Sequence, residues 1–521
     1  MSLISRRWRN VSLWLGLGAL LSPIGFNCHS RTDQSPAVSQ AAEVDSADQT
    51  VRAMASVEVD GAPQGDSKVR LTPSLNGGSI LTAKQAAQAG HVLKLSSADD
   101  AVIVKGTSLL ALYDNECRMK VQGHGPSPAG LKFEAEALVP SNDVALSALT
   151  AQAEADPCLV RVDENRTLQL IAPVTATDAA AFQAESNQVT AQATVNDPRI
   201  AEARHIGFSK ALESWDWFFS GTGITNDVIV AVIDTGIFYT HPDLVDNVYT
   251  NAAGKHGYDF VNSDDDPLDD AGHGTHCSGI IGARANNGIG VSGVMGMRVK
   301  VMGVKVLSAQ GSGSEADIVN GVRYAADQGA QVINLSLGGK FVSPTIRDAL
   351  VYAAGKGVVL AIAAGNDGVL MDAGANFYAP SGYAKDIPGA IAVGSVDSIN
   401  GARSGFSNYS TSYVFIGAPG SAAGSNGVLS TYLANGYTLL QGTSMASPVV
   451  AGAAALLVGA FKSHGIAYVP ADVVNLLTDS ARTNATLTTF FRGGATLDVQ
   501  RAAQLFYSRY VMAGNGGTEV Q

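Results

Sequence analysis

Short apolar runs, rich in β-branched residues, recur along the second part of this chain and constrain its fold most. They occupy residues 228–233, 299–307, 331–337, 357–364 and 390–396. Continuous apolar runs of this kind are typical of strands that are buried on both faces. Residues 315–328 and 344–356 lie between such runs and have helical spacing. The alternation predicts an α/β fold with a mostly parallel buried sheet that helices cover on both sides.

Polar side chains follow two of these runs. In parallel sheets, ligands bind at the carboxyl ends of the strands, so these positions matter most for function. Asp234 follows the first run, and its carboxylate has either a structural or a catalytic role. Asn366 comes just after another run and can donate its side-chain NH₂ group into the same cleft.

A glycine-rich segment with two histidines opens an apolar helical stretch. His273 has a glycine on each side, which lets another chain or a substrate approach the ring closely. His273 and His276 could instead be a metal pair, but no third ligand follows at a useful spacing. The sequence therefore favours His273 as a catalytic base.

Ser444 lies at the start of residues 449–461, whose small and apolar side chains predict a buried helix. A hydroxyl there meets the positive end of the helix dipole, beside backbone N–H groups that can hold an oxyanion. The alternative is a plain helix cap. Together with Asp234, His273 and Asn366, it completes the set of groups that acyl transfer requires. An α/β-hydrolase is disfavoured for two reasons. The catalytic residues follow the order Asp, His, Ser, whereas α/β-hydrolases have the order Ser, acid, His, and no Gly-x-Ser-x-Gly elbow is present.

Three motifs carry a resemblance to a known family: Ile233-Asp234-Thr235-Gly236, Gly272-His273-Gly274-Thr275-His276 and Gly442-Thr443-Ser444-Met445-Ala446-Ser447-Pro448. In this order they resemble the signatures of subtilisin-like serine proteases, the subtilases of peptidase family S8. Cys277 and the opening Asn196-Asp197-Pro198 are most similar to the thermitase and proteinase K side. One departure is Val449, where many relatives have histidine.

The resemblance implies a three-layer subtilisin-like fold and a serine endopeptidase. In that interpretation Ser444 is the nucleophile, His273 transfers its proton and Asp234 orients the imidazole. Asn366 and the backbone N–H of Ser444 hold the oxyanion. Cys277 is then a buried, inert thiol.

The resemblance also implies that a protein or peptide substrate binds as an added strand. Two segments pair with it, and a third walls the primary pocket: Ser336-Leu337-Gly338, Gly311-Ser312-Gly313 and Ala363-Ala364-Gly365. The alternative for residues 311–314 is an ordinary flexible loop. The side-chain preference of the pocket is not predicted.

Structural Ca²⁺ is a further implication, since this cation takes six to eight oxygen ligands. The first site uses the Asp197, Asp243 and Asn287 side chains and the carbonyls of Ala285, Ile289 and Val291. A plain turn is the alternative for residues 286–288. A second site would use Asp259, Asn262, Asp264 and Asp266, for which a solvated acidic loop is an equal alternative.

The N-terminal part is predicted to be removed in stages. Three arginines before the apolar residues 11–21 indicate a secretory signal over residues 1–28, too short for a transmembrane span. We expect a secreted protein, with a periplasmic protein or a lipid anchor at Cys28 as alternatives. Residues 29–88 have the composition of a flexible linker.

Residues 89–172 combine short strands with a helix, which predicts a small α+β domain. Its end resembles subtilase propeptides of the inhibitor I9 type, which implies a ferredoxin-like fold that inhibits the enzyme. The maturation cleavage is expected in the linker 173–195, between about Ile171 and Asn196. The catalytic domain spans 196–510 and a disordered tail 511–521. In an exported protein, Cys117 and Cys158 of the small domain are expected to form a disulfide.

The composition limits the classes of partner that the chain is expected to bind. The net charge is −12, from 34 basic and 46 acidic residues, which disfavours nucleic-acid binding. We expect a monomer with no transmembrane segment. The sequence therefore predicts an exported serine endopeptidase made as a self-processing zymogen. The alternative is a non-catalytic binding or scaffold protein on the same fold, disfavoured because all four catalytic residues are present.

Overall fold

The computed structural model describes residues 58–59, 93–94, 108–138, 146–171, 174–175, 195–221, 223–422 and 427–512. The predicted signal segment 1–28, most of both predicted linkers and residues 513–521 of the predicted tail lie outside these ranges. Helix η9 (Tyr507–Met512) continues two residues into the predicted tail.

A nine-stranded sheet organises the described part of the catalytic region. Its order is β19 (Arg482–Thr483), β20 (Ala495–Thr496), β16 (Ile416–Ser421), β15 (Ala390–Asp397), β14 (Val359–Ala363), β12 (Val332–Leu335), β8 (Val228–Asp234), β10 (Val299–Lys305) and β9 (Gly257–Asp259). All neighbours are parallel except β19 and β20. The five predicted apolar runs supply five central strands, so the predicted mostly parallel sheet is confirmed.

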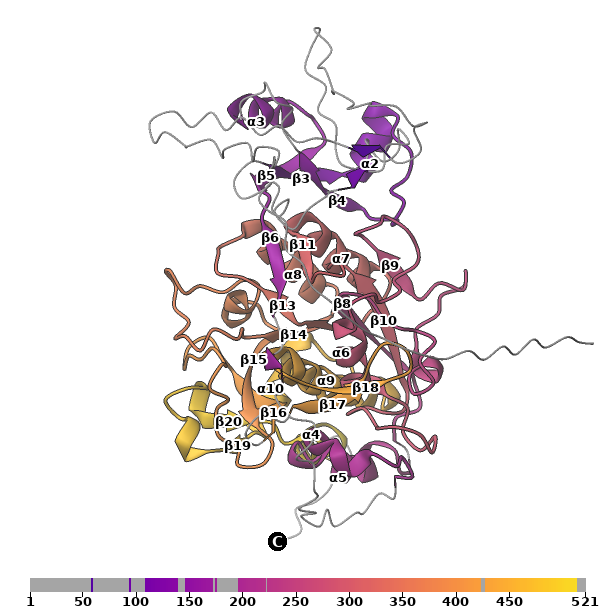
Figure 1. The fold of residues 1–521 in the computed structure, drawn as a ribbon, viewed down its shortest axis with the longest axis vertical. Helices are drawn as coiled ribbons and strands as arrows, with labels where there is room; N and C mark the ends of the chain where they lie inside the picture. Colours follow the sequence, from indigo (N-terminus) through magenta and orange to yellow (C-terminus); the bar gives the residue numbers. More distant parts are fainter. Residues whose placement is uncertain are drawn as a thin grey trace, which may run out of the picture. The chain divides into compact units, whose positions relative to one another are not determined.

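Helices cover both faces of this sheet (Figure 1). The longer ones are α6 (His273–Gly282), α7 (Glu315–Asp327), α8 (Pro344–Gly355), α9 (Thr443–Ser463), α10 (Pro470–Asp479) and α11 (Val499–Phe506). Gly282 of α6 packs on Val299 and Val301, whereas Gly321 of α7 packs on Val304. Since odd and even positions of a strand face opposite ways, α6 and α7 lie on opposite faces. This is the predicted three-layer arrangement.

Helix α9 is the one helix in the described part that is long and apolar enough to cross a membrane. Its most apolar stretch is completely buried, and the helix packs against α6 and the sheet strands, which is the pattern of a core helix. Helices α4 (Arg204–Phe208) and α5 (Ala211–Phe218) precede the first central strand, and α5 packs against α11.

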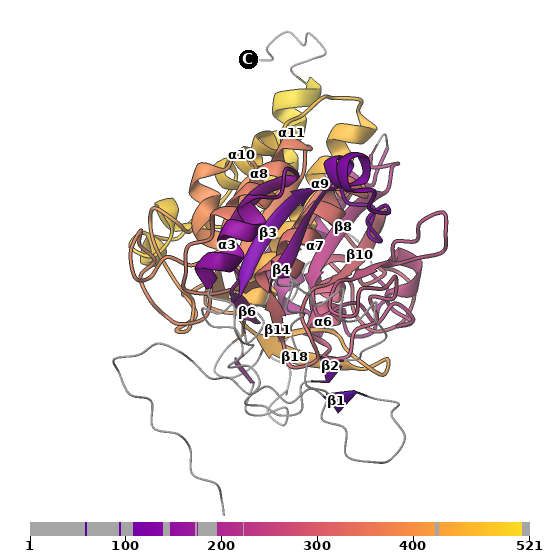
Figure 2. The same ribbon diagram turned by 90° about the horizontal axis from the view of Figure 1, so that it is seen from above.

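A separate three-stranded sheet forms most of the described part of the N-terminal region (Figure 2), where β1 (Glu58–Val59) and β2 (Leu93–Lys94) also pair with each other. Its antiparallel strands lie in the order β4 (Phe133–Leu138), β3 (Leu109–Asp114) and β5 (Leu159–Glu164). Helices α2 (Asn115–Cys117) and α3 (Leu146–Glu154) and the π-helix η2 (Arg118–Gln122) complete it. Side chains at alternate positions of β3 pack against Leu149 and Ala153 of α3. The class is α+β, and the ferredoxin-like topology stays a prediction.

A disulfide joins Cys117 to Cys158 in this small domain. It links the helical segment after β3 to the start of β5. Cys277, the remaining cysteine of the described residues, is free and buried.

Candidate active site

The base and its orienting carboxylate meet between a strand end and a helix start. Asp234 is the last residue of β8, and His273 is the first residue of α6. His273 Nδ1 lies 2.8 Å from Asp234 Oδ1, and both side chains are buried. A hydrogen bond at Nδ1 leaves Nε2 to accept a proton, which is the tautomer that a general base needs.

Ser444 is the second residue of α9, and its hydroxyl faces the backbone of Ile171. Its Oγ donates to the carbonyl of Ile171 at 2.9 Å and lies 3.3 Å from the carbonyl of Ser336. Within the described residues His273 Nε2 has no hydrogen-bond partner. The nucleophile and the base are therefore not hydrogen-bonded here, because the serine hydroxyl points to the Ile171 carbonyl. Such bonds often tighten only along the reaction path.

The Asn366 amide is held by the residue that precedes the nucleophile. Thr443 donates to Asn366 Oδ1 from its backbone N at 2.9 Å and from its Oγ1 at 2.8 Å. These bonds fix the carbonyl end of the amide and so orient its NH₂ group. A Cβ at residue 442 would lie 2.9 Å from Asn366 Nδ2, so this close approach requires Gly442.

Asp269 is a buried residue of the site that the motifs did not reveal. Its carboxylate accepts hydrogen bonds from Thr235 Oγ1 at 2.8 Å, Gly272 N at 2.8 Å and Thr275 N at 2.8 Å. It thus ties the loop after β8 to the first turn of α6, which places Asp234 and His273 side by side. An acidic side chain near a helix N-terminus is favoured by the helix dipole, and this signal could have pointed to it.

Cys277 adds a third potential metal ligand beside the pair. Ligand atoms of Asp234, His273 and Cys277 all lie within 4.8 Å of one another. Burial raises the pKa of the Cys277 thiol. A protonated thiol is a poor metal ligand, and its Sγ donates to the Ser444 carbonyl at 3.4 Å. These contacts favour an inert thiol that packs under the site.

The charge state of His273 carries a prediction for pH dependence. Burial is the largest single effect and lowers its pKa, but the charge and hydrogen bond of Asp234 and the contact with Cys277 together outweigh it, so the pKa lies well above the ordinary value of 6.5. A base must be unprotonated, so kcat/KM of the processed enzyme should rise with pH above 6.5 and reach its plateau in the alkaline range. A pH–rate profile checks this, and a plateau already below pH 6 would contradict it. Because the folded pKa is raised, the stabilisation from protonated His273 is fully present below pH 6.5. It is lost as pH rises through the folded pKa.

The two predicted substrate segments form the walls of one short sheet. They contribute β11 (Ser312–Ser314) and β13 (Leu337–Gly338). Between them lies β6 (Thr167–Leu170), antiparallel to both, and Leu170 N donates to Gly311 O at 2.6 Å (Figure 1). The chain's own residues 167–170 thus occupy the position of an added strand. Beyond Ile171, β7 (Val174–Thr175) pairs with β18 (Tyr437–Gln441), which also pairs with β17 (Val428–Thr431).

The predicted pocket wall ends strand β14 beside Asn366. Ala363 and Ala364 are buried, and Gly365 N donates to Thr443 Oγ1 at 3.1 Å. This bond brings the segment next to the residue before Ser444. Ile171, whose carbonyl accepts the hydrogen bond from Ser444 Oγ, is buried as well.

The residues of the first predicted calcium site converge. Asp243 and Asp197 are both buried, and burial raises the pKa of Asp243 to about 6 and also raises that of Asp197. Within residues 223–422 and 427–512, the hydrogen-bond donors to the Asp243 carboxylate are uncharged: Asn287 Nδ2 at 2.8 Å, Val291 N at 2.9 Å and Tyr437 OH at 3.1 Å.

The loop around Asp243 leaves oxygens for a cation. Among the described residues, no group donates a hydrogen bond to the carbonyl oxygens of Ala285, Ile289 or Val291. Gly290 has a φ of +51°, and a Cβ there would lie 2.3 Å from Asp243 Oδ2. The loop is therefore shaped to wrap closely around this carboxylate, and the donor set fits a hard cation.

The second predicted calcium site is not gathered in the same way. Asp259 is buried and its carboxylate accepts from Asn262 N and Nδ2, at 3.0 and 2.8 Å. Asp264 and Asp266 are exposed, and no three acidic groups of this loop lie within 4.8 Å of one another among the described residues. The geometry gives this prediction no support.

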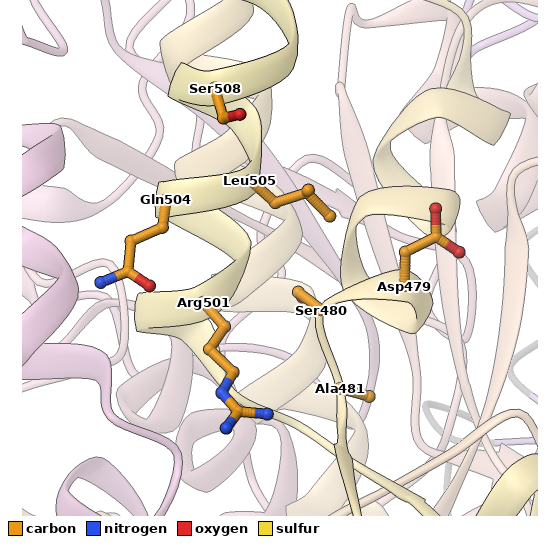
Figure 3. A pocket seen from close by; sticks show the side chains of 7 residues that line it. All are labelled: Asp479, Ser480, Ala481, Arg501, Gln504, Leu505 and Ser508. Carbon is orange, nitrogen blue, oxygen red and sulfur yellow. The ribbon is translucent and has the colours of Figure 1, made fainter. Parts of the chain in front are cut away.

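A surface pocket in the C-terminal part of the catalytic region is separate from this site. It lies between α10 and α11 and is lined by residues such as Asp479, Arg501 and Leu505 (Figure 3). None of the predicted site residues lines it.

Comparison with known proteins decides the family. The profile of the subtilase family (Peptidase_S8) matches residues 225–496, just over half of the chain. This chain belongs to the subtilase family. Subtilases are serine endopeptidases, so the predicted enzyme class is confirmed at the level of the family.

Individual subtilases are similar to about half of this chain. A thermophilic serine proteinase of Bacillus sp. (strain AK1) is 45% identical over 228 residues, which cover 44% of this chain and 51% of that protein. Thermitase of Thermoactinomyces vulgaris is 41% identical over 266 residues, 51% of this chain and 85% of thermitase. A solved protease of Pseudoalteromonas arctica PAMC 21717 superposes with a TM-score of 0.50 at 30% identity, covering 60% of this chain and all of that one. The chain thus spans about half the length of the first relative, most of thermitase and all of the solved protease.

Proposed function

We propose that this chain is an exported serine endopeptidase that is made as a self-processing zymogen. The single observation that carries the proposal is the hydrogen bond of 2.9 Å from Ser444 Oγ to the Ile171 carbonyl. Residues 167–170 lie as a strand between β11 and β13, so this carbonyl arrives as a substrate's scissile carbonyl would.

The proposed reaction is acyl transfer. Ser444 Oγ attacks the carbonyl carbon as His273 Nε2 takes its proton, and Asp234 stabilises the imidazolium. The backbone N–H of Ser444 and the Asn366 NH₂ group hold the resulting oxyanion. The C–N bond then breaks, His273 protonates the leaving amine, and an acyl-enzyme remains. Water, deprotonated by His273, releases the acid and restores the serine.

In the zymogen the bond to be cut joins Ile171 to Ala172. This lies at the amino-side limit of the maturation range predicted from the sequence. We propose that residues 89–171 are the propeptide and inhibitor, and that 196–510 is the catalytic domain. Contacts such as Asn320 Nδ2 to Ala135 O at 2.8 Å hold the small domain on α7 until it is degraded.

A peptide of residues 165–176 tests the proposed activity directly. The processed enzyme should cleave it after Ile171, and mass spectrometry of the two products identifies the bond. A stable peptide would favour the alternative of a non-catalytic binding or scaffold protein.

We also propose that Ca²⁺ binds at the first site. Asp243, Asp197, Asn287 and the three carbonyls of the loop would hold it, and the ion would stabilise the loop that packs on the start of the catalytic domain. It takes no part in the reaction steps above.

Removing calcium should therefore destabilise the enzyme. A chelator should lower the melting temperature by several degrees, since a ligand at a hundred times its Kd adds about 2.7 kcal/mol. Calorimetry with and without chelator measures the shift. The Asp243→Asn variant is the control, because it should melt low in both conditions. Equal melting of the wild type in both conditions would contradict the calcium site.

A further inference from the structure

Glu315, the first residue of α7, is a buried carboxylate that the proposed mechanism does not use. Its side chain is fully buried. Its Oε1 accepts a hydrogen bond from Ser343 Oγ, whereas its Oε2 has no hydrogen-bond partner among the described residues. A buried carboxylate with one unpaired oxygen is costly unless a cation faces it.

Arg166 of the propeptide is the cation that faces it. Arg166 Nη1 lies 3.7 Å from Glu315 Oε2, and the guanidinium carbon lies 5.6 Å from the centre of the Phe341 ring. The backbone of Arg166 is bound at the same place, because Glu315 N donates to Arg166 O at 2.8 Å. Arg166 also pairs with Glu164 at 2.7 Å, but Glu164 belongs to the propeptide and leaves with it.

Ser343 holds the carboxylate in this orientation. It is the N-cap of α8, where its Oγ accepts from Ile346 N at 3.0 Å. Burial raises the pKa of Glu315 to about 7, against the lowering effect of its hydrogen bond to Ser343 and of Arg166. Loss of the propeptide removes the facing cation, so an arriving substrate cation would restore the pair.

The strand register fixes where this cation lies along a substrate. Ser314 pairs with Thr167 and Ser312 with Gln169, so Arg166 comes beside Glu315. Counting Ile171 as the first residue on the amino side of the cleaved bond, Arg166 is the sixth. Resting on the proposed function, we infer that Glu315 and Phe341 form a subsite that selects arginine at the sixth position before the cleaved bond.

Three peptides test this subsite with the processed wild-type enzyme. The first has the sequence of residues 165–176, the second carries Arg166→Gln, and the third exchanges Arg166 and Thr167. The first should have a kcat/KM about tenfold above the other two, which corresponds to about 1.4 kcal/mol for this charge pair. In the Glu315→Gln enzyme this ratio should fall to within about twofold of one.

Asp348→Asn is the matched control variant. Asp348 pairs with propeptide Arg161 at 2.5 Å, outside the strand between β11 and β13, so its removal should keep the tenfold ratio. The wild-type comparison stands even if Glu315→Gln does not fold. Equal rates for the three peptides would overturn the subsite and leave the endopeptidase intact. No cleavage of any peptide would overturn both.

Discussion

The Ser444→Ala variant is expected to accumulate as uncleaved precursor and to lose about 10⁶-fold in kcat. The loss is this large because nucleophile and base act as a unit, as measured for subtilisin. The Ile171 carbonyl would still lie at the site, but no hydroxyl would remain to attack it. Gel mobility of the purified chain and the rate on the peptide of residues 165–176 measure both effects.

Ser447→Ala is the matched control for this prediction. Ser447 lies one turn further along α9, is also buried, and donates to Asn334 Oδ1 at 2.8 Å. The variant loses a buried hydroxyl of the same helix without touching Ile171. It should mature and cleave the peptide, with only a loss of stability. Normal maturation of purified Ser444→Ala would refute the assigned nucleophile.

Replacing Asn366 with alanine is expected to lower kcat by about 10²–10³, the usual effect of losing one oxyanion donor. KM should change little, because the oxyanion forms only after the substrate has bound. Steady-state kinetics of the processed variant on the same peptide separate the two constants.

Asn366→Asp distinguishes donation from positioning. An aspartate keeps an oxygen that accepts from Thr443 N and Oγ1, which now lie 2.9 and 2.8 Å from Asn366 Oδ1, but it has no NH₂ group. We expect a loss similar to that of the alanine variant. An aspartate variant with the wild-type kcat would show that the residue only positions the Thr443 backbone.

Much of the fold was predictable because burial leaves a local pattern. The run 228–233 became β8 (Val228–Asp234), since a strand covered on both faces must be apolar throughout. Strand β16 (Ile416–Ser421) was not predicted, because its glycines and proline read as a turn. Its burial comes from tertiary contacts with α9 and β15, which the local sequence does not carry.

The site also contains residues that the sequence predicts and residues that it does not. Asp234, His273 and Ser444 were predictable because each stands in a motif that needs its own glycines or helix start. Strand β6 was not, since its partners lie more than 140 residues away along the chain and only the folded chain brings them together. The Glu315–Arg166 pair is hidden for the same reason, because neither residue is unusual alone.

N-terminal sequencing of the purified wild-type chain after incubation tests the central claim most directly. The proposal predicts that a new N-terminus begins at Ala172, while Ser444→Ala under the same conditions keeps its original one. An intact bond between Ile171 and Ala172 in the wild type, or the same cut in Ser444→Ala, would contradict self-processing by this site.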